Sequence, residues 1–200
     1  MSSICIGQKY FFIIILSVYA TNSGCSVFFS FFRIKHFKLI SHPDIAYKIT
    51  SLDTLLSRLH HWRAVGSSVV FTNGCFDILH RGHVELLATC RTFGDYVVVG
   101  LNSDASVRNL KGDTRPINDV YARAAVLASL SAVDAVVIFD EETPLSLITQ
   151  IKPNVLVKGG DYVESNIAGA KEVRSYGGAV HIVPVVVGYS TSAIITQLKH

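Results

Sequence analysis

The fold of this chain is decided by one stretch, residues 71–83, which reads FTNGCFDILHRGH. It continues a short apolar, β-branched run at residues 68–72 (SVVFT), which is typical of a buried strand. Asn73 and Gly74 break that run, and a helical pattern follows at residues 83–92. The stretch is therefore predicted to pass from a strand through a tight turn into the amino terminus of a helix. Backbone N–H groups and the helix dipole at such a point favour an anion such as phosphate.

The alternation of strand and helix continues to the end of the chain. Ser51 is the expected N-cap of a helix that ends at Gly66, and Thr143 is the expected N-cap of a later helix. Continuous apolar strands joined by helices indicate an α/β fold, namely a Rossmann-like open parallel sheet of about five strands with helices on both faces. The other predicted strands are residues 96–101, 135–139, 155–158 and 180–187, and the predicted helices are 51–65, 83–92, 121–130, 144–151, 167–176 and 192–198.

Polar residues follow the end of each predicted strand. These clusters are residues 73–74, 102–104, 140–141, 158–162 and 188–192. In parallel sheets covered by helices, ligands bind outside the carboxyl ends of the strands, where the strand order reverses. The coincidence predicts an enzyme site along this edge of the sheet and argues against a purely structural module.

Two histidines three residues apart are the strongest candidates for catalysis. His80 and His83 fall on one face of a helical turn, and Gly82 keeps the space between them clear. Two imidazoles beside a phosphate can donate hydrogen bonds to its oxygens as charge develops during a reaction. The sequence shows no H-E-x-x-H pattern and no third ligand nearby, so we do not expect a metal site.

The composition of the chain excludes several classes of protein. It has 200 residues, of which 50% are hydrophobic and 16% charged, which fits one globular domain with an appendage. Its net charge is only +3 and its basic residues are scattered, so we expect no nucleic-acid partner. The 4 cysteines are widely spaced, which predicts neither a zinc knuckle nor a disulfide scaffold.

Residues 1–43 form an apolar extension that differs from the catalytic domain expected at residues 44–200. No charged residue lies between Lys9 and Arg33, a length close to that of a membrane span, although polar residues 21–24 interrupt it. Three interpretations stay open: a membrane anchor through residues 10–32, a tail without fixed structure, and a translation start assigned too early. We expect a cytoplasmic enzyme, with a membrane-anchored cytoplasmic domain as the alternative, and no cleaved signal peptide.

The pattern G-x-F-D-x-x-H-x-G-H, present at residues 74–83, closely resembles the cytidylyltransferase-like nucleotidyltransferase superfamily, with its HIGH-type fold. A second hallmark of that superfamily is a Ser/Thr-rich turn that opens the last helix, and YSTSAII at residues 189–195 is similar to it. Within the superfamily, the chain resembles the D-glycero-β-D-manno-heptose 1-phosphate adenylyltransferases, often the second half of a bifunctional kinase/adenylyltransferase; here the domain would stand alone. The matching segments are FTNGCFDILHRGHVELL, VGLNSDASVRNLKGDTRPIN, VDAVVIFDEETPLSLI, VLVKGGDY and GYSTSAII.

The resemblance implies that the enzyme transfers AMP from ATP to the heptose 1-phosphate, giving ADP-heptose and pyrophosphate for lipopolysaccharide core or surface-glycan synthesis. Mg²⁺ would enter with ATP, held mostly by phosphate oxygens and water. A homo-oligomer, most simply a dimer, is expected. The implied catalytic residues are His80, His83 and Lys111; the nucleotide-binding residues are Thr72, Asn73, Gly74, Phe76, Lys158, Gly159, Asp161, Ser190, Thr191 and Ser192; and the acceptor-binding residues are Asp77, Asp104, Arg115 and Arg123.

Other functions are compatible with parts of the pattern. Cytidylyl transfer to glycerol 3-phosphate or a similar small phosphate uses the same motif. A non-catalytic nucleotide-binding regulatory module is a second alternative, but the intact His80 and His83 argue against it. A dinucleotide-dependent dehydrogenase is disfavoured because the turn after the first strand lacks G-x-G-x-x-G.

Overall fold

The computed structural model describes residues 16–21, 24–29, 42–160 and 162–198. The chain divides into two units, Met1–Lys38 and Leu39–His200, and each is considered by itself. The boundary between the units falls after Lys38, whereas composition suggested a boundary after residue 43. Helix α1 (Pro43–Lys48) belongs to the second unit.

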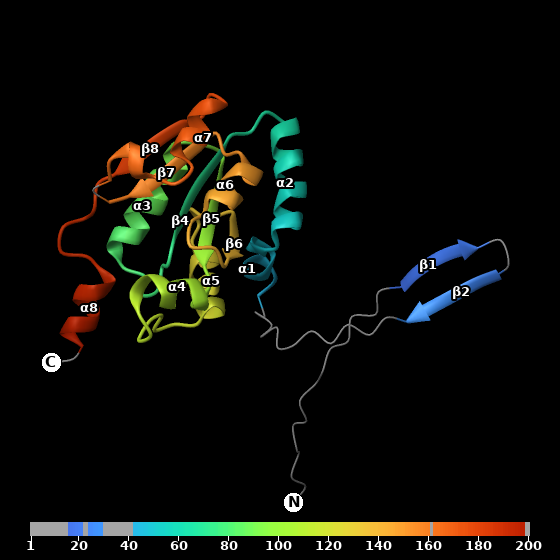
Figure 1. Ribbon diagram of the computed structural model, residues 1–200, viewed down its shortest axis with the longest axis horizontal. Coiled ribbons are helices and arrows are strands. Elements are labelled where there is room, and N and C mark those ends of the chain that lie inside the picture. The colour runs from blue at the N-terminus through green and yellow to red at the C-terminus, as the bar shows by residue number, and fades with distance from the viewer. Residues whose placement is uncertain (1–15, 22–23, 30–41, 161, 199–200) are drawn as a thin grey trace, which may run out of the picture. The chain divides into compact units, whose positions relative to one another are not determined.

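The first unit contains an antiparallel pair of strands, β1 (Leu16–Thr21) and β2 (Gly24–Phe29), drawn in blue in Figure 1. Both strands lie in the segment considered above as a membrane anchor. The remaining parts of that segment, residues 10–15, 22–23 and 30–32, fall outside the described residues. Within the part of the chain that is described, no helix combines the length and the apolar character needed to cross a membrane.

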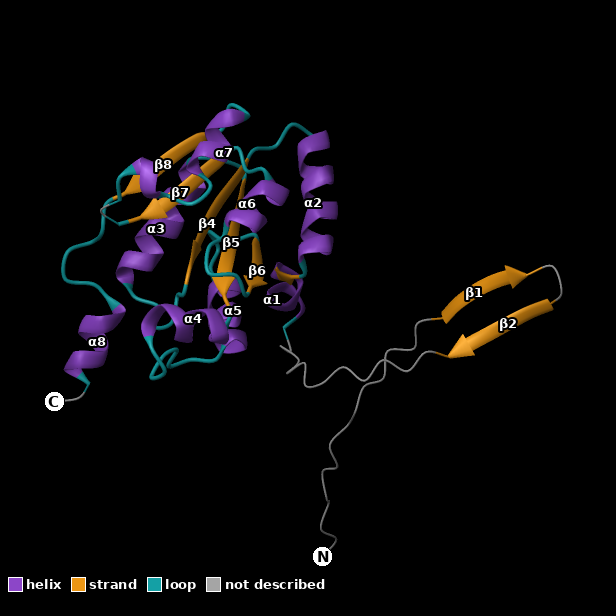
Figure 2. Ribbon diagram, viewed as in Figure 1, coloured by secondary structure: helices purple, strands orange, loops and turns teal. Residues whose placement is uncertain are grey.

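The second unit is built on one parallel sheet, which confirms the predicted α/β class (Figure 2). Its strand order is β3-β6-β5-β4-β7-β8, with β4 near the centre. Six strands are present where about five were expected. The additional one, β3, has only two residues, too few for a hydrophobic pattern to reveal. The strands are β3 (Ile49–Thr50), β4 (Val69–Gly74), β5 (Tyr96–Asn102), β6 (Ala135–Phe139), β7 (Val155–Gly159) and β8 (Ala179–Val183).

Helices cover both faces of this sheet, and each face has its own apolar core. Successive strand residues point to opposite faces, so Phe71 packs into one core and Val70 into the other. The first core joins the sheet to α2 (Leu52–Ala64), α6 (Leu145–Ile151) and α7 (Ala170–Ser175), and the second joins it to α3 (Arg81–Thr92) and α5 (Val120–Ser129). The remaining helices are α4 (Asp104–Lys111), the 3-10 helix η1 (Glu164–Asn166) and α8 (Thr191–Gln197).

Several element ends differ from the predicted ones for local reasons. Ser51 does cap α2, where its side chain accepts a hydrogen bond from the backbone of Thr54. The predicted N-cap Thr143 is wrong: α6 has Pro144 at that position, without a side-chain cap. Strand β8 ends at Val183 and not at residue 187, because the proline that follows has no N–H to donate to a sheet.

The helix expected at residues 167–176 is shorter in the structure, where α7 covers only Ala170–Ser175. Gly169 has a φ of 86°, a left-handed conformation that α7 cannot include, so α7 starts only after it. The residues before it form η1 and a short connection.

The strand order places a switch point beside β4. The chain moves from β4 to β5 and β6 on one side, then returns to β7 and β8 on the other. The carboxyl ends of β4 and β7 therefore flank the position where ligands bind in folds of this type.

Candidate active site

The turn after β4 leads directly into α3. Phe76 in this turn has a φ of 44°, a left-handed conformation that is uncommon for a bulky residue and typical of constrained functional turns. His80 has an extended backbone and occupies the N-cap position of α3, without a side-chain capping bond. His83 follows in the first turn. Both imidazoles therefore lie at the positive end of the helix dipole, as the sequence predicted.

The two imidazole rings are stacked on each other. Their centroids are 3.8 Å apart and their planes differ by 21°. Phe76 packs against His83 at a centroid distance of 5.0 Å. The Nδ1 atoms of both histidines are buried and have no hydrogen-bond partner among the residues that the structure describes. The pair is thus held by ring packing and by a hydrogen bond between His83 and the backbone of Ile78, while both Nδ1 atoms lack a partner among the described residues.

Both imidazoles are held in the neutral form at physiological pH. Burial lowers the pKa of His83 to about 4, and repulsion from His80 adds to this effect. Burial also lowers the pKa of His80 below its ordinary value. A neutral imidazole has one N–H donor and one acceptor nitrogen, so each ring has at most one hydrogen bond to donate to a phosphate oxygen, and in His83 the backbone of Ile78 competes for it.

We expect the free energy of unfolding to fall as the pH is lowered from about 6.5 to about 4. In this range the unfolded chain binds a proton at His83 that the folded chain excludes, so acid favours unfolding. The contribution is fully present above the unfolded pKa and is lost as the pH falls toward the folded one. Urea unfolding of wild type and His83→Gln across this range measures it. Equal pH slopes for the two proteins would show that His83 is not held neutral.

Gly82 lies between the histidines in close contact with His80. A Cβ at this position would lie 3.1 Å from Cε1 and 3.2 Å from Nδ1 of His80. Gly82→Ala should therefore turn the His80 ring and lower kcat about 10- to 100-fold. The unfolding midpoint should change little, since alanine favours the helix. An unchanged kcat in steady-state assays would mean that the ring position of His80 does not matter.

The switch point is bridged by Lys158 at the end of β7 and Asn73 at the end of β4. The Lys158 ammonium donates to Oδ1 of Asn73 over 3.1 Å, and it lies 5.7 Å from the ring centre of Tyr162. Burial lowers the pKa of Lys158. Within the described ranges it forms no ion pair with a carboxylate, so a ligand phosphate is a suitable counter-charge.

The Ser/Thr turn before α8 reaches the histidine motif from the other end of the chain. The Thr191 hydroxyl lies 3.4 Å from the carbonyl oxygen of Ile78, to which it donates. Ser190 is the N-cap of α8, where its hydroxyl accepts from the backbone of Ala193 over 3.1 Å. Ser192 is exposed on the first turn of α8. The structure thus brings this turn and the histidine motif together, as the sequence predicted.

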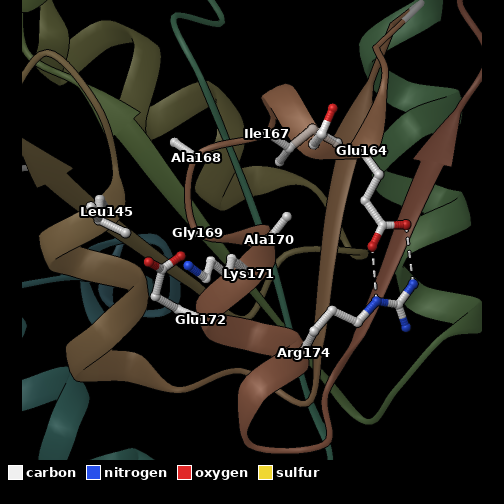
Figure 3. A pocket seen from close by; sticks show the side chains of 10 residues that line it. Leu145, Glu164, Ile167, Ala168, Gly169, Ala170, Lys171, Glu172 and Arg174 are labelled. Carbon is white, nitrogen blue, oxygen red and sulfur yellow. Dashed lines mark hydrogen bonds and ion pairs between the residues drawn. The ribbon is translucent and has the colours of Figure 1, made fainter.

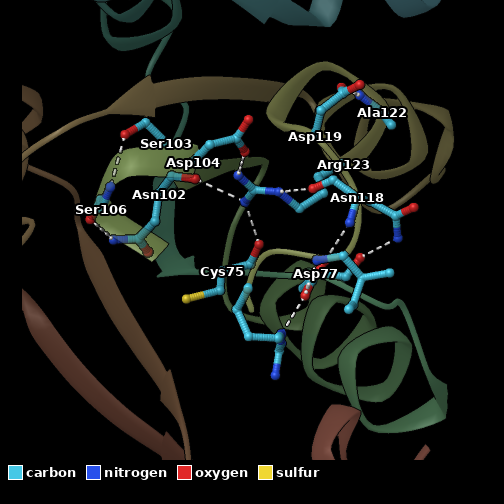
Figure 4. A network of polar contacts seen from close by, with 12 residues as sticks. Cys75, Asp77, Asn102, Ser103, Asp104, Ser106, Asn118, Asp119, Ala122 and Arg123 are labelled. Atoms are coloured by element: carbon cyan, nitrogen blue, oxygen red, sulfur yellow. Dashed lines mark hydrogen bonds and ion pairs between the residues drawn. The ribbon is translucent and has the colours of Figure 1, made fainter. Parts of the chain in front are cut away.

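A fully buried arginine ties the site to the sheet (Figure 4). The side chain of Arg123 donates to the carbonyl oxygens of Cys75 (2.6 Å), Asn102 (2.8 Å) and Asn118 (3.1 Å). It also pairs with Asp104 over 2.7 Å, and its own side chain is 0% exposed. All three of its nitrogens are thus engaged by the protein. This arrangement favours a positioning role for Arg123 and Asp104 over the substrate contact expected from the sequence.

Asp77 and Arg115, both expected to bind the acceptor, form an ion pair with each other. Nε of Arg115 donates to Oδ2 of Asp77 over 2.6 Å. The backbone N–H groups of Ile117 and Asn118 also donate to this carboxylate. Burial raises the pKa of Asp77, but these hydrogen bonds and the charge of Arg115 outweigh it and hold the pKa below its usual value.

The remaining predicted residues are distributed around the same turn. Thr72 is fully buried and its hydroxyl has no partner among the described residues, so it supports the turn from within. Lys111, at the end of α4, is exposed, and its charge acts on Cys75. The two glycines leave room for neighbouring side chains: a Cβ would lie 3.1 Å from the Phe76 ring at Gly74 and 2.9 Å from Leu86 at Gly159. Asp161 lies outside the described residues.

The described part of the domain has a hollow away from the histidines and another beside them. One of about 540 Å³ is formed by residues from η1 to α7 together with Leu145, and includes the Glu164–Arg174 ion pair (Figure 3). None of the predicted site residues that the structure describes lines it. A second hollow of about 210 Å³ borders the turn residues 76–79 and α5. The site is therefore better defined by the histidines and strand ends than by a deep cavity.

Sequence reasoning missed two residues of the site. Asn118 donates to the backbone carbonyl of Asp77 over 2.8 Å, and Asn102 offers its own carbonyl to Arg123. Asn102 follows a predicted strand and belongs to a noted polar cluster, which was a usable signal. Asn118 lies in a loop 41 residues from its partner, where no periodic pattern could identify it.

A helix that begins between two stacked histidines, at the switch point of a parallel sheet, defines an α/β nucleotidyltransferase. The family model described as Cytidylyltransferase-like matches residues 71–197, which is more than half of the chain. The chain belongs to the cytidylyltransferase-like family.

Two relatives named Bifunctional protein HldE are similar to this chain. That of Koribacter versatilis (strain Ellin345) is 54% identical over 157 residues, covering 78% of this chain and 32% of the relative. That of Geotalea uraniireducens (strain Rf4) is 54% identical over 159 residues, covering 80% and 32%. The chain thus spans about a third of the length of these relatives.

A solved structure is also similar. The lipopolysaccharide core biosynthesis protein from Thermoplasma volcanium GSS1 superimposes with a TM-score of 0.50 at 28% identity, covering 60% of this chain and 98% of that one. The family and the fold class predicted from the sequence are therefore confirmed.

Proposed function

We propose that the domain is an adenylyltransferase that transfers AMP from ATP to D-glycero-β-D-manno-heptose 1-phosphate. The observation that carries the proposal is the stacked pair His80–His83 at the start of α3, beside the strand switch point. Two neutral donors at the positive end of a helix are suited to a phosphate whose charge increases in a transition state.

The reaction needs no covalent intermediate with the protein. An oxygen of the sugar phosphate attacks the α-phosphorus of ATP, a new P–O bond forms, and the bond to the β-phosphate oxygen breaks as pyrophosphate leaves. Because a phosphate monoester is already a nucleophile, the protein has only to position the reactants and neutralise charge. His80 and His83 would donate to the α-phosphate, and Lys111 would neutralise phosphate charge.

The nucleotide would lie between the ends of β4 and β7 and the turn before α8. Lys158 and Asn73 would contact it at the strand ends, with Gly74, Phe76 and Gly159 shaping the space. The Ser/Thr turn, residues 190–192, would hold the leaving pyrophosphate through backbone N–H groups and the hydroxyls of Ser190 and Ser192. The Ser190 oxygen accepts from Ala193 and keeps its O–H donor, whereas Thr191 already donates to Ile78.

Magnesium would enter the site as part of the ATP substrate. Among the residues that the structure describes, no group of three or more His, Cys, Asp or Glu side chains is placed to hold a metal ion. The donors that suit Mg²⁺ are then the triphosphate oxygens and water. The Mg²⁺ ion would neutralise part of the negative charge of the triphosphate, so that less of it has to be balanced by the histidines and Lys158.

The heptose acceptor is supported by resemblance and not by geometry. The segments VKGGDY and SDASVRNLKGDTRPIN carry the resemblance to heptose 1-phosphate adenylyltransferases. Identities of 54% to two proteins named Bifunctional protein HldE, and 28% to a lipopolysaccharide core biosynthesis protein, agree with this choice. ADP-heptose would then supply lipopolysaccharide core or surface-glycan assembly. A homodimer remains a prediction.

Pyrophosphate release tests the proposal. The purified protein is incubated with Mg²⁺ and ATP, CTP, GTP or UTP, each with heptose 1-phosphate, glucose 1-phosphate or glycerol 3-phosphate. We expect release only with ATP and the heptose phosphate, and ADP-heptose as the product by mass spectrometry. Preference for CTP with glycerol 3-phosphate would replace the proposal with cytidylyl transfer. Nucleotide binding without turnover on any acceptor would indicate a regulatory module.

A further inference from the structure

The Asp77 carboxylate is completely occupied by the loop that follows α4. Its side chain is 0% exposed. It accepts hydrogen bonds from Nε of Arg115 (2.6 Å), the backbone of Ile117 (2.8 Å) and the backbone of Asn118 (2.9 Å). A substrate hydroxyl cannot reach a carboxylate whose side chain is completely buried beneath these donors. Asp77 can therefore affect ligand binding only indirectly, by fixing the position of Arg115 and of the loop backbone at Ile117 and Asn118.

Arg115 is held by Asp77 through one atom only. Among the described residues, Nε is the only atom of its guanidinium with a hydrogen-bond partner. The side chain retains 13% exposure, whereas that of Arg123 retains none. Arg115 and Lys111 are also close enough for their charges to act on Cys75, which follows β4. Arg115 thus places unused donors at the carboxyl end of the sheet, beside the histidine turn.

Fixing Nε determines where the other two nitrogens point. The guanidinium is planar and rigid. Once Nε is hydrogen-bonded to Asp77, the Arg115 side chain has fewer torsions free to rotate than an unbound arginine side chain. Its Nη1 and Nη2 atoms then form a fork that matches two oxygens of a phosphate. A lysine at position 115 would have a single ammonium group, without the fixed geometry that lets arginine use one nitrogen for the Asp77 carboxylate and two others for a phosphate.

We propose that Asp77 is the positioning residue for acceptor binding: it holds Arg115 at Nε so that Nη1 and Nη2 face the phosphate of the acceptor. The inference rests on the proposed function, because it assumes an acceptor that carries a phosphate. It assigns Asp77 a role through Arg115 and not through contact with the sugar.

A spectroscopic test is independent of turnover. The Arg115 Nε–Hε signal in a ¹H–¹⁵N spectrum is assigned by its loss in Arg115→Lys, and inorganic phosphate is titrated in. In wild type we expect a protected signal that shifts as phosphate binds. In Asp77→Asn the signal should exchange faster, and phosphate binding should weaken about tenfold or more. A signal in wild type that phosphate does not move, or equal phosphate affinity in Asp77→Asn, overturns the proposal.

Kinetics test the same coupling during the reaction. Asp77→Asn and Arg115→Ala should each raise the acceptor KM about 10- to 100-fold, with kcat and the ATP KM nearly unchanged. The double variant should be no worse than Arg115→Ala, because the two residues act as one unit. Additive losses, or a loss confined to kcat, would contradict a positioning role.

A matched control is available at the other end of the sheet. Asp134 accepts from Arg91 over 2.6 Å and from the backbone of Val97 over 2.7 Å, at the start of β5. Asp134→Asn should leave the acceptor KM unchanged. If Asp77→Asn does not fold, Arg115→Lys is measured in its place. An unchanged acceptor KM in Arg115→Lys would overturn the proposal. Wild type that transfers to no sugar phosphate would refute the proposed function, whereas the phosphate titration separately decides whether Asp77 positions the Arg115 donors for a phosphate.

Discussion

Replacing either His80 or His83 with alanine should lower kcat about 10²- to 10³-fold while the domain stays folded. Each neutral imidazole donates one hydrogen bond, and the loss of a donor to a developing charge in a shielded site costs about 2.7–4 kcal/mol of transition-state stabilisation. Both rings also pack on each other at 3.8 Å, so removing one lets the other turn. The loss of transition-state stabilisation in the double variant should therefore be smaller than the sum of the two single losses.

The measurement is single-turnover formation of the nucleotide sugar, which separates chemistry from product release. His60→Ala is the matched control, since His60 is exposed on α2 and no contact of the site involves it. It should retain wild-type kcat. Wild-type rates in His80→Ala and His83→Ala would remove the histidine pair from the mechanism, whatever the effect on ATP binding.

Arg123→Met should be the most destabilising of the substitutions considered, lowering the free energy of unfolding by about 3–5 kcal/mol. The arginine is completely buried and donates to three backbone carbonyls besides its ion pair with Asp104. Methionine fills part of the volume but leaves all of these acceptors without a partner. The carboxylate of Asp104 also loses its counter-charge.

Denaturant unfolding measures this effect, and Arg91→Met provides the comparison. Arg91 pairs with Asp134 over 2.6 Å, but its side chain is 45% exposed, so its loss should cost about 1 kcal/mol or less. Arg123→Lys should recover part of the stability, because the charge facing Asp104 is kept. An equal loss in the free energy of unfolding for Arg123→Met and Arg91→Met would show that the buried hydrogen bonds of Arg123 do not stabilise the domain.

Strands and histidines were predictable because their signals are local. The runs VVF, VVVGL and AVVIF are continuous and apolar, and each became a central strand. The motif around His80 and His83 marks the start of a helix, although His80 is its extended N-cap and only His83 lies in its first turn. The two-residue strand β3 and the left-handed Gly169 were not predictable, because the first carries no pattern and the second depends on packing against Ile148.

The roles of the two arginines could not be distinguished from the sequence. Arg115 and Arg123 both follow the same strand and both carry a charge that suits a phosphate. Arg123 is on the inner face of α5, and its partners at Cys75 and Asn102 lie 48 and 21 residues away. Which arginine is sequestered and which keeps free donors is decided by tertiary packing alone. The same holds for Asp77, whose partners lie about 40 residues downstream.

The hydroxyl of Thr191 and the carbonyl of Ile78 meet across 113 residues of chain. On a ribosome, the histidine turn emerges long before the Ser/Thr turn that faces it. The growing chain can form α3 early, yet under the proposed function it could not enclose a triphosphate until α8 has been synthesised. Such a distant closing contact adds to the contact order and slows the final step of folding. Nascent chains of this enzyme would therefore stay catalytically silent until nearly the last residue of the domain is made.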